Sequence, residues 1–240
     1  MNETIKTQLN HRSIRQFKPL ALTQEEVDLL VDVARHTATS NFRQSYSIIS
    51  ITDETLKEEI AEIANQPYIP NAGHLFVFVV DQRHNTLIAE AKGAEPLVQG
   101  SPERFIAAQN VVVAAESLGM GTVYLGSILN DNAKLSELLK LPKYVYPAVG
   151  LAVGWPDQEP QLKPRLPRHV IHMENYYQDL ENPLEELKDY DAEVHEYYDL
   201  RDLNNRVDEF TTQIAKTMNK SVANRANTLK DLQKQGFFID

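Results

Sequence analysis

A short basic stretch near the N-terminus carries the clearest chemical signal in this sequence. The residues His11-Arg12-Ser13-Ile14-Arg15 place two guanidinium groups and a hydroxyl within four positions. Each arginine presents a planar fork of N–H donors that matches two phosphate or carboxylate oxygens. On a helical turn Arg12 and Arg15 would point the same way, because residues three apart are neighbours on a helix. The pattern predicts a compact anion clamp, with a solvated basic turn as the alternative.

The charge balance of the chain makes a local basic cluster more informative. The 240 residues include 34 acidic and 24 basic side chains, which give a formal net charge of −10. This balance argues against a nucleic-acid partner, because phosphate contacts along nucleic acid need a basic face. An acidic protein that attracts an anionic cofactor must do so through focused positive sites.

The absence of cysteine restricts the redox chemistry of the chain. Disulfides, cysteine-ligated metals and thiol chemistry are excluded, so any electron transfer must use a bound cofactor. The seven histidines show no metal-ligand spacing, and we expect no metal site. The N-terminus lacks a signal-peptide pattern and no apolar window is long enough for a membrane span. We therefore expect a cytoplasmic protein with no membrane partner.

Apolar periodicity and capping residues indicate the elements that must position the basic groups. Thr23 and Glu26 form a predicted capping box, and Asp53 is expected to cap the following helix. The expected helices cover residues 4–9, 23–36, 54–64, 105–118 and 135–139, and the expected strands cover 46–52, 75–80, 123–125 and 146–153. The continuous apolar run 75–80 predicts a strand buried on both faces. Helix 105–118 is apolar almost all round, which predicts a domain centre or a subunit interface. The result is an α+β domain with a small sheet wrapped by helices.

The chain becomes highly polar after Pro183. Helical patches are expected over residues 184–198, 207–218 and 224–235. Such segments bury too little apolar surface to fold alone, so they must pack on a larger body. We interpret residues 1–240 as a single domain and residues 184–240 as a helical excursion of it.

Several motifs occur in an order that resembles a known family. The basic stretch at 11–15 is followed by Leu22-Thr23-Gln24-Glu25-Glu26, Ala115-Glu116-Ser117-Leu118-Gly119-Met120-Gly121, Tyr124-Leu125-Gly126-Ser127, Gly154-Trp155-Pro156 and Leu162-Lys163-Pro164-Arg165-Leu166-Pro167. With the polar C-terminal extension, the set resembles the FMN-dependent nitroreductase superfamily, in its subgroup of NADPH-dependent flavin reductases and major oxygen-insensitive nitroreductases. The resemblance implies a nitroreductase-like fold with a mainly antiparallel sheet. It also implies a homodimer in which residues 184–240 embrace the partner subunit and contribute to NADPH docking.

The resemblance also implies where FMN binds. His11, Arg12, Ser13 and Arg15 would bind the phosphate. Tyr124, Leu125, Gly126 and Ser127 would lie beside the isoalloxazine ring, where a backbone N–H can bond N5. Gln66 is a further residue that the resemblance places in the cofactor site. The hydroxyls and amides of Thr39, Ser40, Asn41 and Gln44 suit hydrogen bonds to a ribityl chain or pyrimidine edge, although the same composition describes any loop. For residues 124–127 the alternative is a plain strand-end turn. Phe42 is either a cover for the flavin or, more commonly for an aromatic at a loop end, a core residue.

A proline-stiffened segment holds two further cations. Pro164 and Pro167 restrict the backbone to extended forms, so Lys163 and Arg165 project the same way at a fixed spacing. They form either a basic surface loop or, as the resemblance implies, a positive site at the pyrimidine edge of the flavin. There a fixed cation stabilises the negative charge that reduction places near N1 and the C2 carbonyl.

Three arginines near the C-terminus bear on the electron donor. The resemblance implies that Arg201, Arg206 and Arg225 capture the 2′-phosphate of NADPH, an anion that suits guanidinium groups. Asp202 opposes this by adding a negative charge. The alternative is that the three arginines pair with the many nearby acids.

Together these features predict an FMN-dependent NAD(P)H oxidoreductase that prefers NADPH. It would pass two electrons by ping-pong hydride transfer to a small-molecule acceptor, namely a nitroaromatic, a quinone or free flavin. Flavin N5 would perform the transfer, so no side chain is expected to be catalytic. A flavin-binding carrier or redox-responsive protein without efficient turnover is the main alternative. Destructive or dehalogenating flavin chemistry is a third.

Overall fold

The computed structural model describes residues 1–90, 102–201, 209–218 and 223–237. The chain divides into two compact units, residues 1–159 with 222–240, and residues 160–221. The second unit therefore begins before the polar excursion expected from residue 184, and the chain rejoins the first unit at residue 222. The role of residues 184–240 in a dimer and in NADPH docking stays a prediction.

The first unit contains a four-stranded antiparallel sheet in the order β1-β2-β4-β3. Its strands are β1 (Tyr46–Ile51), β2 (His74–Asp81), β3 (Gly121–Leu125) and β4 (Val145–Gly154). Its helices are α1 (Glu3–Leu9), α2 (Gln24–Arg35), α3 (Glu54–Ala64), α4 (Arg83–Ile88), α5 (Glu103–Ser117), α6 (Asn132–Leu138) and α11 (Thr228–Lys234). Short 3-10 turns are η1 (Ser40–Phe42), η2 (Ile69–Asn71), η3 (Gly126–Asp131) and η4 (Ala223–Asn227). The α+β expectation is confirmed.

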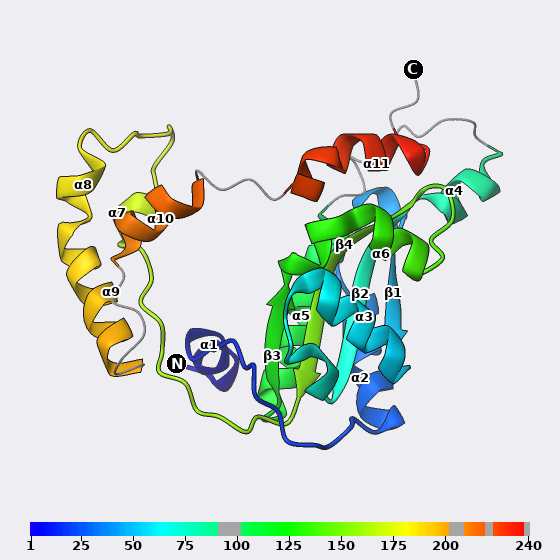
Figure 1. Cartoon of the computed structure of the whole chain (residues 1–240), viewed down its shortest axis with the longest axis horizontal. Coiled ribbons are helices and arrows are strands. Elements are labelled where there is room, and N and C mark those ends of the chain that lie inside the picture. Colours follow the sequence, from blue (N-terminus) through cyan, green and yellow to red (C-terminus); the bar gives the residue numbers. More distant parts are fainter. Residues whose placement is uncertain (91–101, 202–208, 219–222, 238–240) are drawn as a thin grey trace. The chain divides into compact units, whose positions relative to one another are not determined.

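The central strand β2 separates two hydrophobic clusters. Leu75, Val77 and Val79 pack with α3 on one face of the sheet, whereas Phe76 and Phe78 pack with α2 and α5 on the other. This alternation follows from the period of two along a strand, and it confirms the prediction of burial on both faces. Figure 1 shows α3 and α5 on opposite sides of the sheet.

The capping predictions are confirmed at both helix starts. The Glu26 amide donates to Thr23 Oγ1 at 3.2 Å, and the Thr23 amide donates to the Glu26 carboxylate at 2.8 Å. The Leu56 amide donates to Asp53 Oδ1 at 2.8 Å at the start of α3. These bonds satisfy amides that a helix start leaves without partners.

The basic stretch at residues 11–15 is extended and lies beside the start of β3. The Ile14 amide donates to the Thr122 carbonyl at 2.9 Å, and Ser13 forms a parallel bridge with Thr122. The helical-turn geometry for Arg12 and Arg15 is therefore wrong. Gly121 makes the close approach possible, because a Cβ there would lie 2.5 Å from Cγ1 of Ile14.

The second unit has helices α7 (Arg168–Ile171), α8 (Pro183–Glu186), α9 (Lys188–Arg201) and α10 (Phe210–Met218). Leu187, which directly precedes α9, forms a buried cluster with Tyr190 and Val194 of α9, and Phe210 packs against it. Tyr190 and Phe210 meet with ring centroids 5.3 Å apart. The unit thus has a small apolar cluster of its own. None of the helices in the described parts of the chain combines the length and apolar character that crossing a membrane requires.

Candidate flavin site

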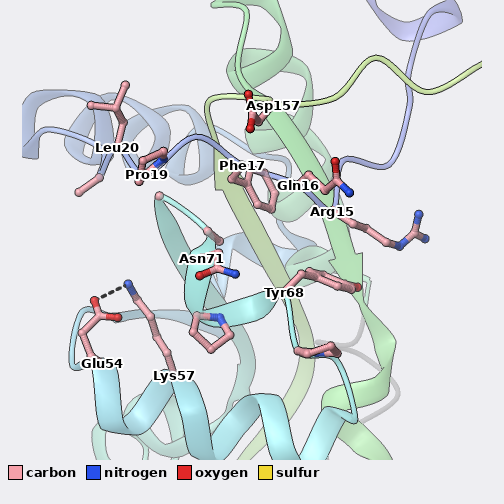
Figure 2. A pocket seen from close by; sticks show the side chains of 15 residues that line it. Arg15, Gln16, Phe17, Pro19, Leu20, Glu54, Lys57, Tyr68, Asn71 and Asp157 are labelled. Atoms are coloured by element: carbon pink, nitrogen blue, oxygen red, sulfur yellow. Dashed lines mark hydrogen bonds and ion pairs between the residues drawn. The ribbon is translucent and has the colours of Figure 1, made fainter.

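Arg15 lines a cavity of about 670 Å³ on the first unit. Its walls come from the segment Arg15–Ala21, from α3 and from the loop around η2 (Figure 2). The segment and the loop meet closely, since a Cβ on Gly73 would lie 2.7 Å from the Leu20 carbonyl. Lys57 is almost fully buried there, and its ammonium donates to Glu54 at 2.9 Å. Gln66 is half-buried and directly precedes Pro67 and Tyr68 of the cavity wall.

Arg12 lines a different hollow of about 390 Å³, beside Glu116 and Gly121. In an extended backbone, residues 12 and 14 face one side and residues 15 and 17 face the other. The cavities follow this alternation, because Ile14 lines the hollow of Arg12 and Phe17 lines the cavity of Arg15. The structure therefore does not bring the two arginines into one cavity.

Of the basic side chains in this segment, Arg12 is the one best placed to donate a hydrogen bond to an anion. Its Nε is buried and has no hydrogen-bond partner among the described residues. A buried guanidinium nitrogen without an acceptor is costly, and each such group calls for an explanation. An anion in this hollow would supply the acceptor.

His11 is held in place by a carboxylate that sequence reasoning missed. Its Nδ1 lies 2.6 Å from Glu116 Oε1, and Thr122 Oγ1 donates to the same oxygen at 2.7 Å. Burial, and then the charge of Glu116, raises the pKa of Tyr124 to about 12, so that phenol stays neutral. Glu116 is the only acidic residue in the expected apolar helix 105–118, and this isolated position was the sequence signal that could have identified it.

The polar loop at residues 39–45 has an unusual backbone. Asn41, Phe42 and Gln44 have φ of 50°, 57° and 49°, in the left-handed region that costs energy for residues other than glycine. Ser40, Asn41 and Gln44 are exposed, whereas Thr39 has a buried Oγ1 without a partner among the described residues. Phe42 is 83% exposed, so the core interpretation of this ring is wrong.

The buried carboxylate of Glu103 holds both ends of this loop. It accepts from the amide of Ser40, and from the amide of Ser45 at 2.9 Å. Glu103 is 1% exposed and lies in the first turn of α5. Sequence reasoning missed it, because the expected helix began at residue 105 and left Glu103 outside it, whereas α5 begins at Glu103.

The strand-end loop after β3 receives one of the predicted NADPH residues. Gly126 and Ser127 begin η3, with Leu125 buried and Gly126 exposed. Arg225 of η4 donates Nη2 to the Gly126 carbonyl at 3.2 Å and to Asn130 Oδ1 at 2.9 Å. The structure thus joins two predicted site segments that lie about a hundred positions apart in sequence.

The remaining predicted cations belong to the second unit. Lys163 and Arg165 are exposed, and Arg165 Nη1 donates to the Lys163 carbonyl at 2.6 Å. Tyr190 Oη donates to the Pro164 carbonyl at 3.4 Å, which ties the stiffened segment to α9. Arg201 is the last residue of α9, and Arg206 lies outside the described residues.

Comparisons with known proteins agree over nearly the whole chain. The family model "Nitroreductase family" matches residues 9–102 and 71–155, and "Nitroreductase family, C-terminal domain" matches residues 163–240. An NADPH-dependent oxidoreductase of Staphylococcus saprophyticus is 39% identical and covers 95% of each chain.

Two solved structures show the same fold. The NfrA1 nitroreductase of Bacillus subtilis is 36% identical, with a TM-score of 0.90 over 98% of this chain and 99% of that one. The NADPH:FMN oxidoreductase of Vibrio harveyi, solved with NAD+, is 34% identical, with a TM-score of 0.87 and the same coverage. The nitroreductase-like fold predicted from the motifs is confirmed.

Proposed function

This chain belongs to the nitroreductase family of oxidoreductases, and on that premise we propose that it is an NADPH-dependent FMN oxidoreductase. Its acceptors would be small molecules: nitroaromatics, quinones or free flavin. The observation that carries the proposal is the buried Nε of Arg12, which has no hydrogen-bond partner among the described residues and follows His11, itself held by Glu116. A phosphate monoester supplies the acceptors that such a donor set needs.

The side chains present fit FMN better than a flavin without phosphate. His11, Arg12, Ser13 and Arg15 offer cationic and hydroxyl donors in one extended segment. Arg12 and Arg15 line two different hollows, but both add positive charge to one segment of a protein whose formal net charge is −10, which favours an anionic ligand near this segment. The buried Thr39 hydroxyl is a further donor that lacks a partner among the described residues.

When bound, FMN would accept a hydride at N5 from NADPH and pass two electrons to the acceptor in a ping-pong cycle. Lys163 and Arg165 would supply positive charge toward the reduced ring, and the amides of Gly126 and Ser127 would donate to it. No side chain needs to act as a nucleophile.

We propose that Arg201, Arg206 and Arg225 bind the 2′-phosphate of NADPH. Of these, Arg225 has one nitrogen of its guanidinium occupied by Gly126 and Asn130. A guanidinium has five N–H donors, so this anchor leaves others available for phosphate oxygens. NADH offers only a ribose hydroxyl at this position, and we therefore expect NADPH to be preferred.

We propose a homodimer as the working form. Helix α5 is buried on one side, yet Phe105 and Ile106 on its other side are 46% and 43% exposed. A groove of about 900 Å³ lined by α1, α2 and α5 adjoins this helix. The exposed side chains of Phe105 and Ile106 are apolar surface that a second copy would cover, and the groove is lined mostly by polar residues. Light scattering coupled to gel filtration measures the mass directly.

The test of the redox function is an anaerobic titration of FMN-loaded protein with NADPH and, separately, with NADH. We expect loss of flavin absorbance near ~450 nm with about one equivalent of NADPH, and slower loss with NADH. A bound flavin that neither donor reduces would overturn the reductase proposal in favour of the carrier.

Cofactor binding has its own test. The double variant Arg12→Ala/Arg15→Ala should lose FMN affinity while keeping its weaker affinity for riboflavin, which lacks the phosphate. Arg35→Ala is the matched control, because Arg35 is an exposed arginine paired with Asp32 on α2. Unchanged FMN binding by the double variant would contradict the phosphate assignment.

A further inference from the structure

The loop at residues 39–45 combines polar groups suited to a flavin with a backbone that is unfavourable in isolation. Three of its residues have left-handed φ, and neither Phe42 nor Gln44 is of a type that adopts this region readily. Such a conformation persists only where the surroundings over-determine it. The contacts that fix this loop therefore bear on the shape of the site.

We propose that Glu103 is a positioning residue of the flavin site, which it serves by holding loop 39–45 in its left-handed conformation, with Asn85 as its auxiliary. The proposal rests on the proposed function and on the sequence-based prediction that Thr39, Ser40, Asn41 and Gln44 contact FMN. Glu103 itself touches no cofactor in this account; it acts through the loop backbone.

The two oxygens of Glu103 bond the two ends of the left-handed stretch. Oε1 accepts from the Ser40 amide and Oε2 accepts from the Ser45 amide at 2.9 Å. Ser45 is fully buried and Glu103 nearly so, and the bond between them is therefore shielded from competing water, whereas Ser40 is exposed. A carboxylate supplies two equivalent acceptors, whereas an amide side chain supplies one. A glutamate at position 103 can therefore accept from both loop amides at once, with one oxygen for each.

Asn85 of α4 supports the loop from another element. Its Nδ2 lies 3.1 Å from the Arg43 carbonyl and 3.1 Å from Ser45 Oγ. Within the loop, the Arg43 amide donates to the Ser40 carbonyl at 3.0 Å. The backbone between Ser40 and Ser45 is consequently fixed from α5, from α4 and from within, while the Phe42 ring remains exposed.

The experiment compares Glu103→Gln with the wild type in two measurements. In the flavin-free protein, hydrogen exchange by NMR should show faster exchange at the amide of Ser40 or Ser45. In a fluorescence titration, FMN affinity should fall about tenfold, the factor expected from loss of a hydrogen bond to a charged group. Glu26→Gln is the matched control, since Glu26 also accepts from a backbone amide but caps α2. It should leave FMN affinity unchanged.

A second variant keeps the proposal testable if Glu103→Gln fails to fold. Asn85→Ala removes donors from a half-buried site and should weaken FMN binding several-fold in the same direction. Faster loop exchange with unchanged FMN affinity in either variant would overturn the positioning role, as would unchanged exchange. A wild-type protein that binds no FMN would instead overturn the proposed function, so the two failures are distinguishable.

Discussion

Replacing Gly121 with alanine tests how the basic segment is seated against β3. A Cβ at this position would lie 2.5 Å from Cγ1, 2.8 Å from Cβ and 3.0 Å from Cγ2 of Ile14. Ile14 is buried, and its amide bonds the Thr122 carbonyl at 2.9 Å, so it cannot yield without moving the segment that carries Arg12 and Ser13. The substitution should therefore disturb both stability and flavin binding.

The expected cost combines two contributions. Overpacking of a buried side chain costs about 1–3 kcal/mol, and weakening the Ile14 hydrogen bond adds about 1 kcal/mol. Gly121→Ala should accordingly lower the free energy of unfolding by about 2–4 kcal/mol, measured by urea denaturation of the flavin-free protein. FMN affinity should fall with it, because His11, Arg12 and Ser13 move with Ile14.

A double-mutant cycle with Ile14→Ala separates this explanation from a general preference for glycine. Alanine at position 14 removes the two γ-carbons in the clash and keeps only the Cβ contact of 2.8 Å, so Gly121→Ala should cost at least about 1 kcal/mol less in that background. Gly126→Ala is the matched control for stability, because no atom lies within 4 Å of a Cβ built there. Equal costs of Gly121→Ala in both backgrounds would refute the steric argument.

Three further predictions follow from single contacts. His74 has its pKa lowered to about 4, first by burial and then by the charge of Lys57, so the unfolded chain takes up a proton at higher pH than the folded chain does. Stability should therefore fall by about 3 kcal/mol between pH 6.5 and 4, and urea unfolding of His74→Phe should lack this part of the pH dependence. Phe42→Ser should change the unfolding free energy of the flavin-free protein by less than about 0.5 kcal/mol, because the ring is 83% exposed. A larger loss of stability, measured by thermal unfolding, would indicate that Phe42 is a core residue after all. Arg225→Ala should raise the KM for NADPH about tenfold or more and that for NADH much less, and equal effects on both donors in steady-state kinetics would count against 2′-phosphate recognition.

Much of the fold could be predicted because its determinants are local. The capping box at Thr23 and the cap at Asp53 depend on residues three positions apart, and both helices begin as expected. The apolar run at 75–80 needs only its own composition to indicate burial on both faces. The ordered motifs supplied the family and the fold, which the comparisons confirm.

The tertiary partners of the site could not be predicted in the same way. Glu103 reaches Ser40 and Ser45 across about sixty positions, and Glu116 reaches His11 across 105. Nothing in the spacing of these residues marks one acid of an acidic chain as the partner of a particular amide or imidazole. The core prediction for Phe42 was wrong for a related reason. Residue type alone favours the core for an aromatic ring, but the left-handed backbone of this loop leaves the ring exposed.

The extended form of residues 11–17 changes what the two arginines can do together. A helical turn would have aimed both guanidiniums at one anion, but a strand-like backbone alternates its side chains. Arg12 shares its side with Ile14 in the smaller hollow, and Arg15 shares the other side with Phe17 in the larger one. Only the first of these two guanidiniums has a buried nitrogen that lacks a partner among the described residues. The free energy gained by adding an acceptor is greatest where a donor is already buried without one. Arg12 should therefore contribute more to phosphate binding than the exposed Arg15, although the sequence presents them as a symmetric pair.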